Sequence, residues 1–276
     1  MVLSRLTKSS ILTSYLEGYQ SASGDLATII NNSVATGFFK WGFVILRGVY
    51  DNDDEWQTFL NLFKAAIADE LHDSKLEDQL GPHLEWTVIE DRTALESASK
   101  ATVRTRFLAW VEEQKRDGEI ADRPWAAGYL PRYKFCLYVD EVCIKSIVAR
   151  LHGGKLIGFQ WCLSSTGSVV IVNGLHQDYT PEEKDDADDD EEEDDDEGYM
   201  EVDGTTHYDV GWAYIGVLGY AELYSNLGSG GSHGQIWDGM VYRGRRPERD
   251  PEPDYDYGRP LSEVERGAKY GQRIKK

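Results

Sequence analysis

The charged side chains best placed for chemistry come directly after three apolar segments of the chain, at residues 41–47, 86–89 and 133–139. If these segments are parallel strands, the groups that follow them meet at one edge of a sheet, where open α/β sheets bind ligands. Carboxylates beside arginines can hold a cationic substrate or an ion network. We therefore predict catalytic and substrate-binding groups at this edge. The predicted catalytic residues are Glu90, Asp91, Asp140 and Glu141, and the predicted substrate-binding residues are Arg47 and Arg92.

The same side chains have a purely structural alternative. Asp140 is placed to cap the helix predicted after it, and Asp91 can pair with Arg92 or with Arg47. Capping and ion pairing would account for these residues without any substrate, so the sequence leaves both interpretations open.

The sequence carries no motif typical of a metal or nucleotide site. None of its six histidines falls in an HxxxH or HExxH pattern. The glycine-rich stretches at 153–154 and 228–234 lack the spacing of a phosphate-binding loop. We therefore expect neither a metal nor a cofactor. The spacing singles out no nucleophile either, because Ser99, Ser146 and Ser164 are equally placed.

A run of acidic residues at 182–197 contains fourteen carboxylates and one lysine, which contribute −13 to the formal net charge of −20. Like charges repel each other and such a run buries no apolar surface, so we predict a disordered acidic insert at 181–200. The alternative is an acidic patch that binds a metal ion or a guanidinium group.

The elements that must position the strand-end residues alternate between strand and helix. Apolar residues at helical spacing predict helices over 56–71, from Ser99 through 111, and from Asp140 through Leu151. This alternation predicts an α+β or α/β fold with a single mixed sheet flanked by helices.

Three segments make up the predicted domain organisation. Residues 36–245 form one domain, which contains the acidic insert. Residues 1–35 form a peripheral N-terminal segment, in which Ile29 and Ile30 can pack on the body. Residues 246–276 form a C-terminal tail.

Composition indicates a globular protein of a reducing compartment. Hydrophobic residues make up 41% of the chain and aromatic residues 12%, enough to build a core. No apolar run reaches the roughly 18 residues that a membrane span needs. Cys136, Cys143 and Cys162 have apolar neighbours and form no CxxC pair, so we expect buried free thiols. These observations predict a cytoplasmic protein that does not span a membrane.

Four blocks of the sequence resemble a large set of fungal proteins, most of them described as hypothetical. The blocks are 41–47 with Tyr50 and Trp56, 86–92 with parts of 98–110, 131–141 (PRYKFCLYVDE), and 211–212. Together they span roughly residues 38–245. This set is similar to the arginine-containing cyclodipeptide synthases of fungi.

The resemblance implies an activity. Those enzymes condense arginine with a second amino acid, both drawn from aminoacyl-tRNAs, into a diketopiperazine of secondary metabolism. Acyl transfer from an activated ester needs no ATP and no redox cofactor, in keeping with the missing nucleotide loops. The family's acidic DDxxE motif matches this chain only inside the acidic run, at Asp188-Asp189-x-x-Glu192 and, one residue later, at Asp189-Asp190-x-x-Glu193. The resemblance therefore implies Asp188, Asp189 and Glu192 as substrate-binding residues.

A tRNA substrate would need a basic face, because tRNA is a polyanion. Residues 100–150 are locally basic, and we predict Lys100, Arg104 and Arg106 as tRNA-binding residues. The high net negative charge argues against such a partner. The alternative function is a non-enzymatic interaction module whose acidic insert binds a basic partner.

Overall fold

The structure is a computed structural model, and it describes residues 26–148, 151–152, 155–156, 167–176, 209–217, 219–228 and 237. The acidic insert predicted at 181–200 and the tail predicted at 246–276 lie outside the described residues, so neither prediction is tested.

Five strands form one mixed sheet in the described part of the chain, in the order β2–β1–β3–β6–β7. β1 pairs in parallel with both β2 and β3, whereas β6 is antiparallel to β3 and β7 is antiparallel to β6. The three apolar segments that precede the charged groups are therefore neighbouring parallel strands. The strands are β1 (Val44–Arg47), β2 (Val88–Ile89), β3 (Phe135–Val139), β6 (Ser168–Asn173) and β7 (Trp212–Gly216).

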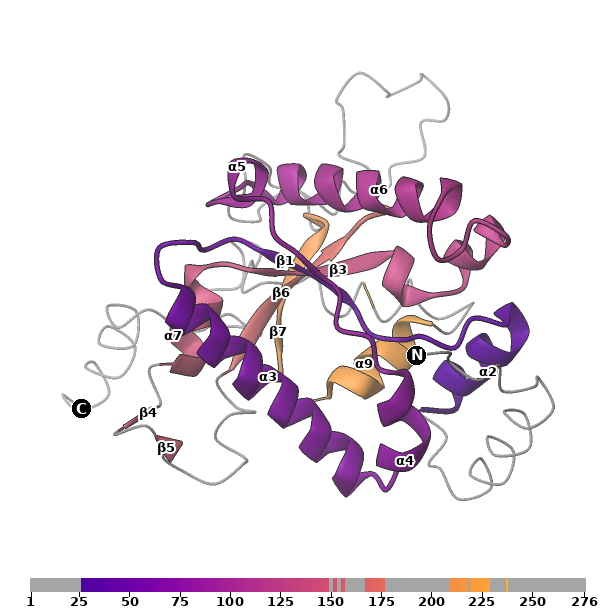
Figure 1. The fold of residues 1–276 in the computed structure, drawn as a ribbon, viewed down its shortest axis with the longest axis horizontal. Coiled ribbons are helices and arrows are strands. Elements are labelled where there is room, and N and C mark those ends of the chain that lie inside the picture. The colour runs from indigo at the N-terminus through magenta and orange to yellow at the C-terminus, as the bar shows by residue number, and fades with distance from the viewer. Residues whose placement is uncertain are drawn as a thin grey trace, which may run out of the picture.

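Helices cover both faces of this sheet. α3 (Asp53–Asp73) follows β1, and α7 (Glu141–Val148) follows β3, and these two helices pack against each other. α5 (Arg92–Leu95) and α6 (Lys100–Arg116) follow β2 and lie on the opposite face (Figure 1). The fold is thus the single mixed sheet with flanking helices that the sequence predicts.

Local signals fix where the helices begin. The side chain of Asn52 accepts hydrogen bonds from the amides of Asp54 and Glu55 at the start of α3. Ser99 accepts one of 3.2 Å from the amide of Thr102 at the start of α6, as predicted.

The third predicted helix ends earlier than expected. α7 stops at Val148, and Leu151 lies in the short strand β4 (Leu151–His152), which pairs with β5 (Lys155–Leu156) in a separate two-stranded sheet. Pairing of Leu151 with Leu156 replaces the helical turn that its apolar spacing suggested.

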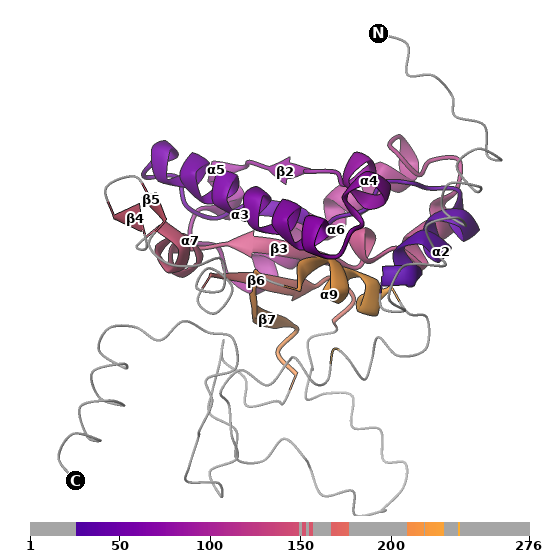
Figure 2. The same cartoon turned by 90° about the horizontal axis from the view of Figure 1, so that it is seen from below.

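The two ends of the sheet carry different helices. Figures 1 and 2 both show α2 (Ala27–Thr36), α4 (Glu77–Leu80) and α9 (Tyr220–Leu227) at one end, and α7 with β4 and β5 at the other. Three short 3-10 helices complete the described elements: η2 (Gly81–His83), η3 (Pro124–Gly128) and η4 (Pro131–Tyr133).

Helix α2 belongs to the segment that was expected to be peripheral, and it packs on the body. Leu26, Ile29 and Ile30 are buried in the same hydrophobic cluster as the sheet. The side-chain amide of Asn32 donates a hydrogen bond of 2.9 Å to the carbonyl of Gly228, at the end of α9.

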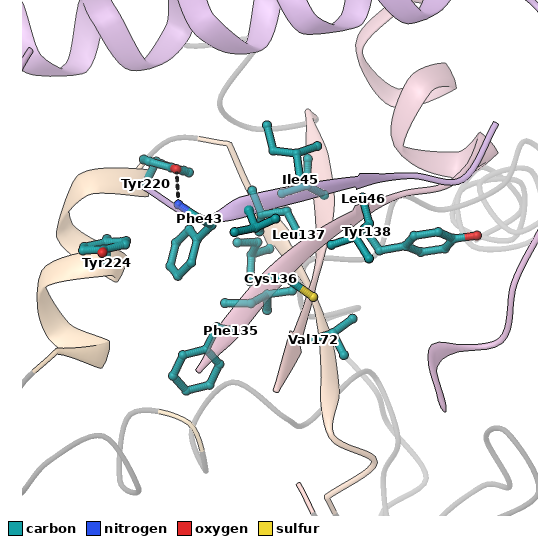
Figure 3. Packing of buried hydrophobic residues seen from close by; sticks show 14 of the residues in the cluster. Phe43, Ile45, Leu46, Phe135, Cys136, Leu137, Tyr138, Val172, Tyr220 and Tyr224 are labelled. Atoms are coloured by element: carbon teal, nitrogen blue, oxygen red, sulfur yellow. Dashed lines mark hydrogen bonds between the residues drawn. The ribbon is translucent and has the colours of Figure 1, made fainter. Parts of the chain in front are cut away.

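The core is built around β1 and β3, whose residues are all buried. Figure 3 shows Tyr220 and Tyr224 of α9 against Phe43, and the hydroxyl of Tyr220 accepts a hydrogen bond of 2.8 Å from the amide of Phe43. Cys136 and Cys143 are buried and unbridged, as predicted, whereas Cys162 lies outside the described residues.

A fully buried arginine ties the amino ends of the parallel strands together. Arg132, just before β3, donates a hydrogen bond of 3.1 Å to the carbonyl of Gly42, just before β1. It also donates to the hydroxyl of Thr87, just before β2. One guanidinium thus connects the segments that lead into β1, β2 and β3, and this arrangement stabilises the amino ends of the parallel strands.

None of the helices that the structure describes is long and apolar enough to cross a bilayer.

Candidate functional site

Four of the charged residues named from the sequence lie along one edge of the sheet, which we call the carboxyl edge (residues 47–53, 90–92 and 140–141). Arg47 is the last residue of β1, Glu90 and Asp91 follow β2, and Asp140 follows β3. The strand register places the ends of the three strands level with one another. The sequence prediction that these groups share an edge is therefore confirmed.

Arg47 is buried, and two carboxylates at the carboxyl edge contact its guanidinium. Its Nε donates a hydrogen bond of 2.7 Å to the carbonyl of Val49. Its two terminal nitrogens reach Asp53 and Glu90, and the contact with Glu90 Oε1 is 3.4 Å. The Arg47 side chain is 6% exposed, whereas those of Glu90 and Asp53 are 50% and 81% exposed. The carboxylates thus form a solvent-facing rim over a buried guanidinium.

Two aromatic rings complete the surroundings of Arg47. Its guanidinium carbon lies 4.6 Å from the ring centroid of Tyr50 and 5.1 Å from that of Trp56. The indole N–H of Trp56 also donates a hydrogen bond of 3.0 Å to Glu90 Oε1. Burial raises the pKa of Tyr50, so its ring remains a neutral phenol at neutral pH. Carboxylates and aromatic rings thus surround the guanidinium of Arg47.

Asp91 has a capping role and an ionic partner. Its Oδ1 accepts a hydrogen bond of 3.2 Å from the amide of Ala94 in the first turn of α5, and its Oδ2 lies 3.3 Å from Nε of Arg106. Its own amide donates to the hydroxyl of Tyr50 at 2.9 Å. The structural alternative therefore accounts for Asp91, with Arg106 as the partner in place of Arg92 or Arg47.

Asp140 caps α7 with one oxygen and turns the other toward two polar side chains. Oδ1 accepts a hydrogen bond of 3.0 Å from the amide of Cys143. Oδ2 accepts one of 3.0 Å from the hydroxyl of Tyr214 on β7 and lies 3.4 Å from Nζ of Lys100. We call Lys100, Asp140 and Tyr214 the lysine–aspartate–tyrosine group.

Aromatic rings enclose the lysine of this group. The Lys100 ammonium lies 4.9 Å from the ring centroid of Tyr138 and 5.1 Å from that of Trp212. Burial raises the pKa of Tyr138 to about 12, and its hydroxyl donates a hydrogen bond of 3.1 Å to the carbonyl of Leu95. The side chains of Lys100 and Asp140 are 16% and 17% exposed. The group is therefore largely shielded from water but not sealed off from it.

The two carboxylates contact the same helix. Asp91 pairs with Arg106 and Asp140 with Lys100, both on α6, so the two side chains do not lie on opposite faces of the sheet. Lys100 and Arg106 are six residues apart, which corresponds to a rise of about 9 Å along the helix axis. The carboxyl edge therefore carries two neighbouring polar groups on one face.

Two of the predicted site residues turn away from this arrangement. Glu141 is 69% exposed and pairs with Lys145 one helical turn later. Arg92 is 61% exposed and pairs with Glu96. Their placement at strand ends is as predicted, and both side chains lie largely at the solvent-facing surface. Glu141 has no described contact with the polar groups above, whereas the guanidinium carbon of Arg92 lies 5.9 Å from the ring centroid of Tyr50.

The predicted basic face needs one clear correction. Arg104 is buried, 6% exposed, and its Nε donates a hydrogen bond of 3.0 Å to the carbonyl of Asn173. A buried guanidinium cannot meet tRNA phosphates, so Arg104 does not contribute to such a face. Its position carried a signal, because on α6 it shares a stripe with Phe107 and Val111, which are buried.

Other predicted candidates are either used in structure or lie outside the described residues. Ser99 caps α6, and the hydroxyl of Ser146 donates to the carbonyl of Cys143 at 2.7 Å. Asp188, Asp189 and Glu192, as well as Ser164, lie outside the described residues.

Sequence reasoning missed the partner of Asp140. Trp212 and Tyr214 are two residues apart on β7, so their side chains project to the same side of the sheet. This spacing can be read from the sequence. The sequence does not show, however, that β7 lies two strands away from β3, which is what brings Tyr214 to Asp140.

No group of three His, Cys, Asp or Glu side chains in the described ranges is arranged to hold a metal ion. No protein-family model, no curated protein and no solved structure matches this chain.

Proposed function

We propose that this chain is a cytoplasmic aminoacyltransferase of the cyclodipeptide synthase type, which condenses arginine with a second amino acid from aminoacyl-tRNAs into a diketopiperazine. The resemblance of the four sequence blocks supports this proposal. The structural observation that supports it best is the position of Asp140, whose carboxylate lies beside Lys100 and Tyr214 at the carboxyl edge.

The lysine–aspartate–tyrosine group fits acyl transfer. In that reaction the α-amino nitrogen of one aminoacyl group attacks the ester carbonyl carbon of the other, and the ribose oxygen leaves. Asp140 would accept the proton of the attacking amine and return it to the departing ribose oxygen. The ammonium of Lys100 would stabilise the negative charge that develops on the carbonyl oxygen.

The rim of carboxylates above Arg47 fits recognition of the arginine side chain. In the described part of the chain, the contacts of Glu90 with Arg47 and Trp56 both use Oε1, and neither uses Oε2. Asp53 stands beside it on the exposed rim. Two carboxylates on a surface edge can bind a guanidinium through paired hydrogen bonds.

Expression in a heterologous host tests the activity, with mass spectrometry of the extracts as the readout. We expect a new arginine-containing diketopiperazine. Asp140→Asn should lower its yield by about a hundredfold or more. Glu141→Gln is the matched control, because it changes the adjacent carboxylate, which faces solvent. A wild-type extract without such a product, from cells that contain folded protein, contradicts the proposal.

An interaction module is the second candidate function, and one observation favours it. Each of the three cations predicted to bind tRNA has an internal partner: Lys100 contacts Asp140, Arg104 contacts Asn173, and Arg106 contacts Asp91. This pairing weakens the case for a basic face, which tRNA binding requires.

Binding of tRNA at low and high salt separates the two candidates. The enzyme proposal requires binding that weakens steeply as salt rises, and Arg106→Glu should weaken it further. Lys115→Glu is a suitable control, because it reverses a charge farther along α6. Absence of binding at low salt favours the interaction module.

A further inference from the structure

Lys100 lies at the amino end of a helix, where a positive charge is unfavourable. It is the first residue of α6, directly after the capping serine, and the first turn of this helix contains no acidic residue. The positive end of a helix dipole opposes a positive charge at that position. Asp140, which follows β3, supplies the negative charge that the first turn of α6 lacks.

The surroundings of Lys100 combine water exclusion with two groups that can move protons. The rings of Tyr138 and Trp212 flank Nζ, and the side chain is 16% exposed. Asp140 Oδ2 lies 3.4 Å from Nζ, and the same oxygen accepts the hydrogen bond of Tyr214. Lysines that form covalent adducts with carbonyl compounds are typically desolvated in this way, with an acid or base nearby.

We propose that Lys100 is a reactive amine that forms an imine with small aldehydes or ketones, with Asp140 and Tyr214 as its proton-transfer partners. The site lies at the carboxyl edge, where open sheets of parallel strands bind ligands. This activity does not depend on the proposed acyl transfer, because it needs neither tRNA nor an aminoacyl ester.

The chemistry balances with the groups present. Asp140 takes a proton from the Lys100 ammonium, and the free amine attacks the carbonyl carbon to give a carbinolamine. Tyr214 donates a proton to the carbinolamine hydroxyl, which leaves as water, and the C=N bond forms. The nitrogen proton released in this step returns to the tyrosinate, so that one carbonyl compound and one amine yield one imine and one water.

Other described lysines provide comparisons. Lys145 is 69% exposed and pairs with Glu141 on its own helix, without a hydroxyl donor in its described ion pair. Lys134 is buried, and burial lowers its pKa, but its described hydrogen bond of 3.4 Å goes to the carbonyl of Leu227 at the end of α9. A carbonyl oxygen cannot donate a proton to a leaving hydroxyl, so the described contact of Lys134 does not provide the proton donor that imine formation needs.

Reductive trapping tests the proposal on the intact chain. The protein is incubated with propionaldehyde or pyruvate and sodium cyanoborohydride, which reduces an imine to a stable secondary amine. Peptide mapping by mass spectrometry then gives the labelling rate at each lysine. We expect Lys100 to be labelled at least about tenfold faster than Lys145, because a carboxylate and a hydroxyl proton donor both lie beside Lys100, whereas the described ion pair of Lys145 offers a carboxylate alone.

Variants sharpen the test. Lys100→Arg should remove the fast labelling, and Tyr214→Phe should slow it by about tenfold or more while labelling of Lys145 stays unchanged. Labelling at Lys145 serves as the internal control for folding and reagent. Labelling of Lys100 no faster than that of Lys145 in the wild-type protein overturns the proposal, whatever the variants do. Fast labelling with no diketopiperazine in cells would support this inference and contradict the proposed acyl transfer.

Discussion

The hydroxyl of Tyr214 on β7 donates a hydrogen bond of 3.0 Å to Asp140, which follows β3, so the bond reaches across strand β6. Lys100 approaches the same carboxylate oxygen from α6. Three elements that are distant in sequence therefore converge on one carboxylate, and this convergence has a measurable energetic consequence.

Asp140→Asn should lower the free energy of unfolding by about 1–3 kcal/mol, because it leaves a largely buried ammonium without its counter-charge. Glu141→Gln should change it by less than about 0.5 kcal/mol, since that carboxylate is exposed. Urea denaturation of both variants measures the difference.

A double-mutant cycle shows whether the group acts as a unit. The combined Asp140→Asn and Tyr214→Phe variant should lose at least about 0.5 kcal/mol less than the sum of the single losses. Strict additivity would show that the 3.0 Å hydrogen bond makes no contribution to stability.

The carboxyl edge could be predicted from the sequence because its signals are local. Arg47 and Asp140 each stand where an apolar run ends, and the runs are rich in branched and aromatic residues.

The first strand nevertheless begins later than its apolar pattern suggests. Gly42 has a φ of +108°, and Trp41 is confined to an isolated bridge with Leu84. A backbone turn at a glycine between two aromatic residues leaves the apolar pattern unchanged, so the pattern alone could not reveal it.

The partners of the edge residues could not be predicted, because they depend on strand order. Asp91 pairs with Arg106 and not with the neighbouring Arg92, since α6 runs back over the sheet and brings Arg106 to it. Spacing along the chain reports which residues share a face of one element. It does not report which element is packed opposite that face.

The carboxylate of Glu70 on α3 should make stability depend on pH. It accepts hydrogen bonds of 3.0 and 3.1 Å from the amides of Tyr220 and Ala221 at the start of α9. Burial raises its pKa above 4.5 in the folded protein, and the amide hydrogen bonds only partly oppose this. The folded state therefore binds a proton more tightly than the unfolded state. The stabilising effect of that proton is fully present below about pH 4.5 and is lost as pH rises through the folded pKa.

Glu70→Gln should flatten this part of the pH profile, because glutamine does not titrate. Urea denaturation at several values from about pH 4 to about pH 7 measures the slope. Asp69→Asn, at an exposed neighbouring carboxylate, controls for the loss of one negative charge. An unchanged slope in the Glu70→Gln variant would contradict the raised pKa.

Gly211 should tolerate alanine far less well than Gly219. Both have a positive φ, +72° and +79°, so both replacements carry the backbone cost of a left-handed residue. A Cβ at Gly211 would lie 2.2 Å from a terminal nitrogen of Arg104 and 2.5 Å from the ring of His176, whereas a Cβ at Gly219 would meet no atom of the described residues within 4 Å.

We therefore expect Gly219→Ala to cost about 1 kcal/mol and Gly211→Ala about 1–3 kcal/mol more, measured as free energies of unfolding. Equal losses would mean that Arg104 and His176 move aside without cost. That result would also weaken the view of Arg104 as a fixed, buried structural residue.

Deleting residues 182–197 should leave the described body folded. His176 and Asp209, which bound the undescribed stretch that contains the acidic run, lie in contact, with 3.4 Å between Nδ1 and Oδ2. Asp209 also accepts hydrogen bonds from the amide of Gly211 at 2.6 Å and from the indole N–H of Trp237 at 2.9 Å. Since the body itself holds these two positions together, the retained residues 177–181 and 198–208 only need to close a short gap.

The thermal midpoint should shift by no more than about 2–4 °C, which corresponds to about 1 kcal/mol for a domain of this size. A larger drop would show that the acidic run contributes to folding. An unchanged midpoint with loss of diketopiperazine would instead indicate that the acidic run, which contains Asp188, Asp189 and Glu192, takes part in the reaction.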